Sequence, residues 1–122
     1  MNGVGRLQLA PTGNQGTAGL IDNVSFDARA LATAEWTQHR LLYLTPELQE
    51  DVHLSGEPSI KVRISANQPA MNLSVMLVSL PWTEGRRSSK GGVITRGWAD
   101  PQNHASLTES QPLEPGAFYE VE

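Results

Sequence analysis

Apolar and polar residues alternate along several short stretches of the chain, as expected for strands with one sheltered face. Residues 59–65 read SIKVRIS. The three apolar side chains, Ile60, Val62 and Ile64, would lie on one face, because successive side chains of a strand point to opposite sides. The other face carries only serine, lysine and arginine. This stretch therefore predicts a half-buried antiparallel strand with one face in water.

Other stretches carry strand patterns of different kinds. Residues 72–80, NLSVMLVSL, are largely apolar on both faces, which predicts a strand between two layers. Residues 40–45, RLLYLT, predict a buried strand that Pro46 would end, since proline has no N–H for a ladder. Further strands are expected at 6–10, in 47–58 where Val52 and Leu54 alternate with Asp51 and His53 until Gly56 turns the chain, at 93–99, and at 118–121 after a Pro115-Gly116 turn.

The sequence predicts little helix. Residues 25–36 are rich in alanine but irregular in apolar spacing, so either a short helical turn or an extended coil is expected there. No helical crossover separates the strands after Leu41, whereas a fold built from βαβ units would need one. Short strands between Gly and Pro turns are typical of an all-β sandwich or barrel. At 122 residues the chain has room for one domain.

Charge and composition disfavour several functions. The formal net charge of −4 disfavours non-specific binding to nucleic acid or to an anionic membrane. The one basic cluster, Arg86-Arg87 with Lys90, lies among Gly and Ser and indicates a solvated loop. No apolar run is long enough to span a membrane and the first residues lack a signal-peptide pattern, so a soluble protein, cytoplasmic or secreted, is expected. The chain contains no cysteine, which excludes disulfides and thiolate chemistry.

The sequence lacks the usual catalytic and metal-binding patterns. It has no Gly-X-Ser-X-Gly segment, on which α/β-hydrolases place their nucleophile. His39, His53 and His104 lie 14 and 51 residues apart, without the close spacing of metal-ligating pairs. Neither a metal nor another cofactor is therefore expected. Glu50 and Asp51 would point to opposite faces of a strand, so they could not act together on one substrate.

Residues 94–107, ITRGWADPQNHASL, hold a candidate ligand platform. Small β-sandwiches bind sugars by stacking them on exposed aromatic rings beside polar groups. Trp98 with Asp100 and His104 of the following loop, and Trp82 earlier in the chain, have the required residue types. The competing interpretation is structural: Trp98 covers an edge of the core, Asp100-Pro101 sets a turn and His104 lies on the loop. We prefer the structural interpretation, because a tryptophan at the end of a strand is more often part of a core.

Several motifs occur in an order that is specific to one family. They are LYLTP, then EDV with a Ser-Gly-X-Pro turn, the alternating VRIS, a strand ending in LVS, then RGWADPQ, and finally PGAFY. In this order they resemble the C-terminal jelly-roll domain of the X-prolyl dipeptidyl-peptidase and cocaine-esterase group of serine hydrolases. The resemblance covers roughly residues 6–122 and is strongest from Leu41 onward. The segment TRGWADPQN makes it strongest toward the X-prolyl peptidase members.

The resemblance implies a galactose-binding-like jelly roll with no chemistry of its own. In such enzymes the catalytic serine, aspartate and histidine come from an α/β-hydrolase domain that precedes the jelly roll, and that domain would be the partner of this chain. The jelly roll would stabilise it and shape the substrate pocket, with Asn72 and Leu73 at the turn that faces the acyl pocket in cocaine-esterase-like relatives. The family's sandwich continues beyond the Pro-Gly-X-X-Tyr motif, so residues 1–122 are expected to form one partial domain without its last strands.

Two other functions stay open at this level. One is a free-standing carbohydrate-binding module built around Trp98. The other is an interaction domain that forms a homo-oligomer through an open sheet edge, because a sheet that stops short leaves backbone groups unpaired. An accessory domain of an X-prolyl dipeptidyl-peptidase is the preferred prediction.

Overall fold

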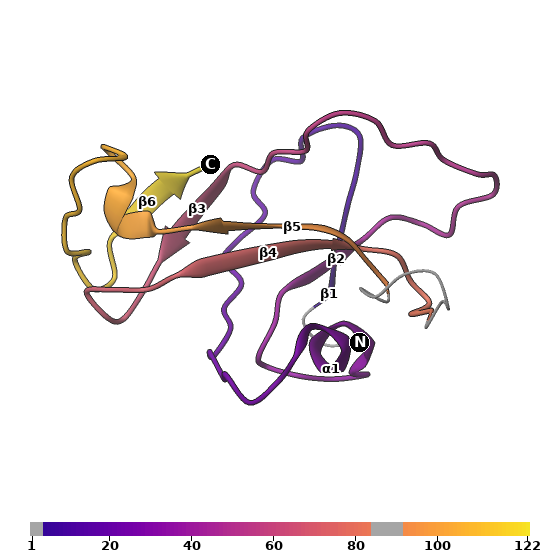
Figure 1. The fold of residues 1–122 in the computed structure, drawn as a ribbon, viewed down its shortest axis with the longest axis horizontal. Coiled ribbons are helices and arrows are strands. Elements are labelled where there is room, and N and C mark those ends of the chain that lie inside the picture. Colours follow the sequence, from indigo (N-terminus) through magenta and orange to yellow (C-terminus); the bar gives the residue numbers. More distant parts are fainter. Residues whose placement is uncertain (1–3, 84–91) are drawn as a thin grey trace. The chain divides into compact units, whose positions relative to one another are not determined.

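The computed structural model describes residues 4–83 and 92–122 (Figure 1). The chain divides into two compact units. One unit comprises Met1–Leu54 with Val78–Val93, and the other comprises Ser55–Leu77 with Ile94–Glu122. The basic cluster at 86–90 lies outside the described residues. The elements in chain order are β1 (Val4–Arg6), α1 (Ala28–Thr33), β2 (Leu42–Leu44), β3 (Val62–Ser65), β4 (Leu73–Val78), β5 (Val93–Ala99), the 3-10 turn η1 (Pro101–Asn103) and β6 (Phe118–Val121).

Strands make up most of the regular structure, so the prediction of an all-β fold is confirmed. In the described part of the chain they pair as β1 with β2, β3 with β6 and β4 with β5 (Figure 1). The jelly-roll sandwich itself stays a prediction.

The first strand pair is parallel and short. β1 runs beside β2 with Val4 opposite Leu42, and the N–H of Leu7 adds one bond of 2.8 Å to the Leu44 carbonyl. Pro46 follows closely, and β2 ends before it as predicted. The prediction of a strand at 6–10 was wrong in its bounds: β1 ends at Arg6, and Leu9, which pairs with no strand among the described residues, is fully exposed.

The alanine-rich stretch forms a helix rather than a coil. The Asp27 carboxylate caps α1 by accepting the N–H of Ala30 at 2.8 Å. This side-chain acceptor satisfies one of the N–H groups that the first turn of a helix leaves unpaired. With only six residues, α1 depends on such caps and on packing, and Ala32 is its buried residue.

Arg40 holds the other end of α1. Its guanidinium donates from Nη1 to the Leu31 carbonyl and from Nη2 to the Ala34 carbonyl, the second at 2.8 Å. Arg40 is only 7% exposed, and its Nε has no hydrogen-bond partner within the described residues. Burial lowers the pKa of the Arg40 guanidinium, because desolvation penalises the charged form. A buried cation thus supplies the donors for the end of the helix.

The segment between β2 and β3 corrects one prediction from the sequence. A strand was expected in 47–58, yet no strand forms there, and Val52 and Leu54 are more than half exposed. Alternation alone gives a strand no stability, since a strand also needs a neighbour to take its hydrogen bonds. Gly56 turns the chain as predicted, with a φ of 108° that favours glycine.

The antiparallel pair of β3 and β6 confirms the clearest prediction. Val62 lies opposite Val121 and Ile64 opposite Tyr119, which places apolar residues of both strands on one face. Arg63 and Ser65 of β3 are exposed on the other face. The pattern of SIKVRIS therefore predicted the strand and its wet side, but β3 begins only at Val62, and Ile60, which was expected on the sheltered face, is 48% exposed.

A tight turn leads into β6, as the Pro115-Gly116 pair predicted. The N–H of Ala117 bonds to the Glu114 carbonyl at 3.0 Å, and Gly116 has a φ of 83°. Proline followed by a residue of positive φ is the geometry of a type II turn. The N–H of Gly116 also bonds to the Ala66 carbonyl at 2.8 Å, so the turn is joined to the end of β3.

β4 pairs with β5, and the N–H of Ser79 extends the pair with a bond of 2.8 Å to the Gly92 carbonyl. Both faces of β4 were expected to be covered, but Leu77 is exposed, so this expectation was wrong for the described chain. Within residues 4–83 and 92–122, the buried apolar side chains are few, namely Ala32, Val93, Leu113 and Val121, with Pro101 fully buried as well.

Candidate functional site

Trp98 lies on the open side of β5. Val93 is buried and Thr95 and Ala99 are half-buried, whereas Ile94, Arg96 and Trp98 are exposed. The two sets alternate because side chains of a strand point to opposite faces. Trp98 is 69% exposed, so the prediction that it covers an edge of the core was wrong: its position along β5 places it on the outer face.

Arg96 is the neighbour of Trp98 on that face. Its guanidinium carbon lies 5.7 Å from the centre of the indole ring, which is within the range of a cation–π contact. Residue 97, which separates Arg96 and Trp98 in the sequence, is a glycine and adds no side chain to the opposite face of the strand. Arg96 and Trp98 thus form an exposed aromatic and cationic surface.

Asp100 sets the turn after β5, as predicted. Its Oδ1 accepts the N–H of Gln102 at 2.9 Å, and its carbonyl accepts the N–H of Asn103 at 2.9 Å. The carboxylate is therefore the cap of η1, with Pro101 at the first position of that turn.

His104 is fixed at the end of η1. Its Nδ1 lies 3.0 Å from the Pro101 carbonyl, and because a carbonyl only accepts, Nδ1 must carry the proton. The ring packs against Tyr119 with 4.5 Å between centroids, and the Tyr119 hydroxyl accepts the N–H of Glu114 at 2.8 Å. His104 thus connects η1 to β6, and no contact joins it to Trp98 in the described part of the chain.

No hydrogen bond or ring contact joins the other two histidines to Trp98, Asp100 or His104 among the described residues. His39 bonds through Nδ1 to the Ile21 carbonyl at 2.7 Å and stacks on Phe26. His53 is exposed in the segment between β2 and β3. In residues 4–83 and 92–122, no three His, Asp or Glu side chains gather closely enough to hold a metal ion. The same residues contain no helix with the length and apolarity that a membrane crossing requires.

Asn72 and Leu73 lie at the start of β4. Asn72 is exposed and Leu73 is half-buried as the first residue of the strand. The turn before them is held by the N–H of Leu113, which bonds to the Pro69 carbonyl at 2.8 Å. Their assignment to a substrate pocket stays a prediction.

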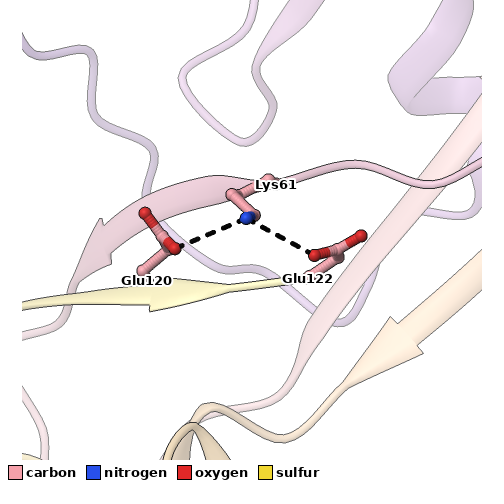
Figure 2. Close-up of polar contacts among 3 residues, drawn as sticks. All are labelled: Lys61, Glu120 and Glu122. Carbon is pink, nitrogen blue, oxygen red and sulfur yellow. Dashed lines mark ion pairs between the residues drawn. The ribbon is translucent and has the colours of Figure 1, made fainter.

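An ion-paired group that the sequence reasoning missed lies on the wet face of β3 and β6. The Lys61 ammonium is 3.7 Å from Glu120 Oε1 and 3.6 Å from Glu122 Oε2 (Figure 2). Continuing the register by one pair brings Lys61 opposite Glu122, with Glu120 on the diagonal. The alternating charges in SIKVRIS and YEVE were a signal, but it could be used only once these two strands were known to pair.

We expect the Lys61 cluster to contribute little to stability. Lys61→Ala should lower the free energy of unfolding by less than about 1 kcal/mol, because all three side chains are more than half exposed. Urea unfolding at low and high salt measures this, and the difference should shrink as salt screens the charges. Lys61→Arg, which keeps the charge, is the control. A loss that persists in high salt would contradict a surface role.

In the described chain, whose regular structure is mostly strands, several charged side chains hold the ends of α1, cap the turn after β5 or lie on a strand face. A model of the X-Pro dipeptidyl-peptidase C-terminal non-catalytic domain family matches residues 2–122. The chain belongs to this family.

Similar proteins are much longer than this chain. A Rhodopirellula baltica protein named "Putative Xaa-Pro dipeptidyl-peptidase" is 57% identical over 119 residues, which cover 97% of this chain and 19% of that protein. A Bacillus cereus protein of the same name is 36% identical over 81 residues, covering 66% of this chain and 13% of that protein. A Streptomyces avermitilis protein of the same name is 28% identical over 162 residues, covering 98% of this chain and 23% of that protein. The chain thus spans about a fifth of such relatives, and no solved structure matches it.

Proposed function

We propose that this chain is the accessory β domain of an X-Pro dipeptidyl-peptidase, a serine hydrolase whose α/β-hydrolase domain belongs to the same polypeptide. The observation that carries the proposal is the family match over residues 2–122. The length of the relatives supports it, since about four-fifths of the Rhodopirellula protein lies outside the matched segment. This chain has no Gly-X-Ser-X-Gly segment, so the nucleophile would come from the catalytic domain.

We further propose that Asn72 and Leu73 line the substrate pocket of the complete enzyme. Asn72 is exposed and Leu73 half-buried, so both keep surface for a substrate or for the catalytic domain. The bond from Leu113 to the Pro69 carbonyl supports the role, because a pocket wall has to be held in place by its scaffold. The jelly roll would then act on substrate binding rather than on the chemical step.

The complete polypeptide is expected to hydrolyse an Xaa-Pro-anilide, and residues 1–122 alone are expected to be inactive. In the complete enzyme, Leu73→Ala should raise KM several-fold while kcat changes little, because a lost pocket wall weakens substrate and transition state alike. Ser74→Ala is the matched control, since Ser74 is the next residue of β4 and points to the opposite face.

Two results would contradict these proposals separately. Turnover by pure residues 1–122 would rule out the accessory role. Equal kinetics of Leu73→Ala and Ser74→Ala would rule out the pocket wall while leaving the accessory role intact.

A further inference from the structure

Large apolar side chains are mostly uncovered in this chain. Among the described residues, four apolar side chains are buried, whereas eighteen large apolar side chains are exposed. Single exposed apolar residues are ordinary, but contiguous ones mark surfaces that another molecule or domain covers.

The outer face of β5 gathers exposed apolar side chains on one strand. We define it by Ile94, Arg96 and Trp98, which are consecutive outward positions on one strand. Ile94 is 49% and Trp98 69% exposed, and Arg96 stacks over the indole. The strand beneath is fixed by its pairing with β4 and by the buried side chain of Val93. The face is thus held in position without being covered.

We propose that the outer face of β5 docks against the catalytic domain of the same polypeptide, at an apolar surface that carries a carboxylate for Arg96. This inference rests on the proposed function, which places a catalytic domain in the same polypeptide. The family is a C-terminal domain and the Rhodopirellula relative is about five times longer, so a large surface of that polypeptide is available to cover the face.

The side chains of this face suit a protein partner. Tryptophan and arginine are the residues that most often dominate the binding energy of protein interfaces. Arg96 has no carboxylate partner among the described residues, and a guanidinium that becomes buried needs an acceptor. The partner surface must therefore supply both apolar contact for Ile94 and Trp98 and a negative group.

A sugar fits the same face less well. Sugar sites place several hydrogen-bonding groups beside the aromatic ring. Oδ1 of Asp100 already accepts from Gln102, and Nδ1 of His104 already bonds to Pro101. One polar atom of Asp100 and one of His104 are thus engaged by η1, which leaves fewer hydrogen-bonding groups for a sugar beside the indole.

Hydroxyl-radical footprinting of the complete polypeptide tests the proposal. The oxidation rate of each side chain is measured in the folded protein and divided by its rate in urea, so that intrinsic reactivity cancels. We expect Trp98 to be protected roughly tenfold, because the centre of an interface excludes water. Leu107, which is 95% exposed on the loop after η1, should keep a ratio near one. A Trp98 ratio near one would overturn the proposal.

A pair of variants gives a second readout. Trp98→Ser in the complete polypeptide should separate one calorimetric transition into two or lower its midpoint by several degrees, because the two domains would no longer stabilise each other. Leu107→Ser removes an equally exposed apolar side chain outside the face and should leave the transition unchanged. Equal behaviour of the two variants would count against docking.

Hydrolysis of an Xaa-Pro-anilide by the same sample distinguishes the two proposals. Protection of Trp98 without hydrolysis would keep the docking surface and reject the proposed activity. Hydrolysis with an unprotected Trp98 would keep the proposed activity and reject the docking surface. If Trp98 becomes protected only when a glycan is added, the face binds a sugar and the docking proposal is wrong. If the gene encodes no further domain, both proposals are wrong.

Discussion

Leu113→Ala is expected to lower the free energy of unfolding by about 2–5 kcal/mol, the range for truncating a buried leucine. Leu113 is only 3% exposed and is the most buried of the four apolar core residues. The loss has two parts: the hydrophobic free energy that the removed side-chain atoms contributed by being buried, and the cost of the cavity that they leave. The hydrogen bond from the Leu113 N–H to the Pro69 carbonyl fixes the backbone, so the site cannot easily collapse. Urea unfolding of the purified protein measures the change.

Leu107→Ala is the matched control for this core substitution. Its side chain is 95% exposed, so the same truncation should change stability by less than about 0.5 kcal/mol. Amide hydrogen exchange adds a local readout: the Leu113 variant should accelerate exchange in β3 and β6, which share its compact unit. Equal losses for the two variants would show that Leu113 is not part of a packed core.

Arg40→Ala is expected to destabilise the unit that contains α1 by about 2–4 kcal/mol. Removing the guanidinium leaves the part-buried Leu31 and Ala34 carbonyls without their donor, and an acceptor left unsatisfied costs about 1–3 kcal/mol where water does not reach it. The loss of the buried charge, whose Nε is unpaired, offsets part of this cost. Urea unfolding gives the total, and faster amide exchange in α1 would locate it.

Two further variants separate the causes. Arg40→Met keeps much of the volume but donates nothing, so it should lose nearly as much stability as Arg40→Ala if the hydrogen bonds matter. Arg6→Ala removes an exposed arginine of β1 and should be nearly silent. A stable Arg40→Met variant would show that Arg40 acts through packing alone.

The lowered pKa of Arg40 also fixes the sign of a pH effect. A cation whose pKa is lower in the folded state than in the unfolded state binds its proton more weakly after folding. Stability from this group therefore rises with pH, and only in the strongly alkaline range where arginine begins to lose its proton. Between mild acid and mild base Arg40 is charged in both the folded and the unfolded state. The difference in the free energy of unfolding between the natural chain and the Arg40→Met variant should therefore not change with pH in this range.

Local pattern predicted the strands that have a partner and failed where no partner forms. Within residues 59–65, Val62–Ser65 pair with β6, so the existence of the strand and its wet face were predicted correctly, whereas its start at 59 and the shelter of Ile60 were not. Residues 47–58 also alternate, but nothing in the described chain pairs with them, and the pattern cannot report a missing neighbour. The Pro115-Gly116 turn was predictable because proline and glycine fix the backbone locally.

The candidate site was less predictable for the same reason. Asp100 as the cap of η1 follows from local chemistry, since an aspartate before a proline is a turn signal. The exposure of Trp98 depends on which face of β5 is covered, and the ion pairs of Lys61 depend on the pairing of β3 with β6. The burial of Arg40 had no local signal, because its partners lie on a helix that precedes it.

The pairing of β3 with β6 has a consequence during synthesis. About fifty residues separate these strands in the sequence, so β3 leaves the ribosome long before its only partner in the described chain exists. At about 5–20 residues per second, the wait is of the order of several seconds. The apolar edge of β3 is then open to other chains, and folding cannot finish before translation has passed β6. Slower translation between the two strands would lengthen this aggregation-prone interval. A chaperone that binds extended apolar segments would reduce aggregation during it.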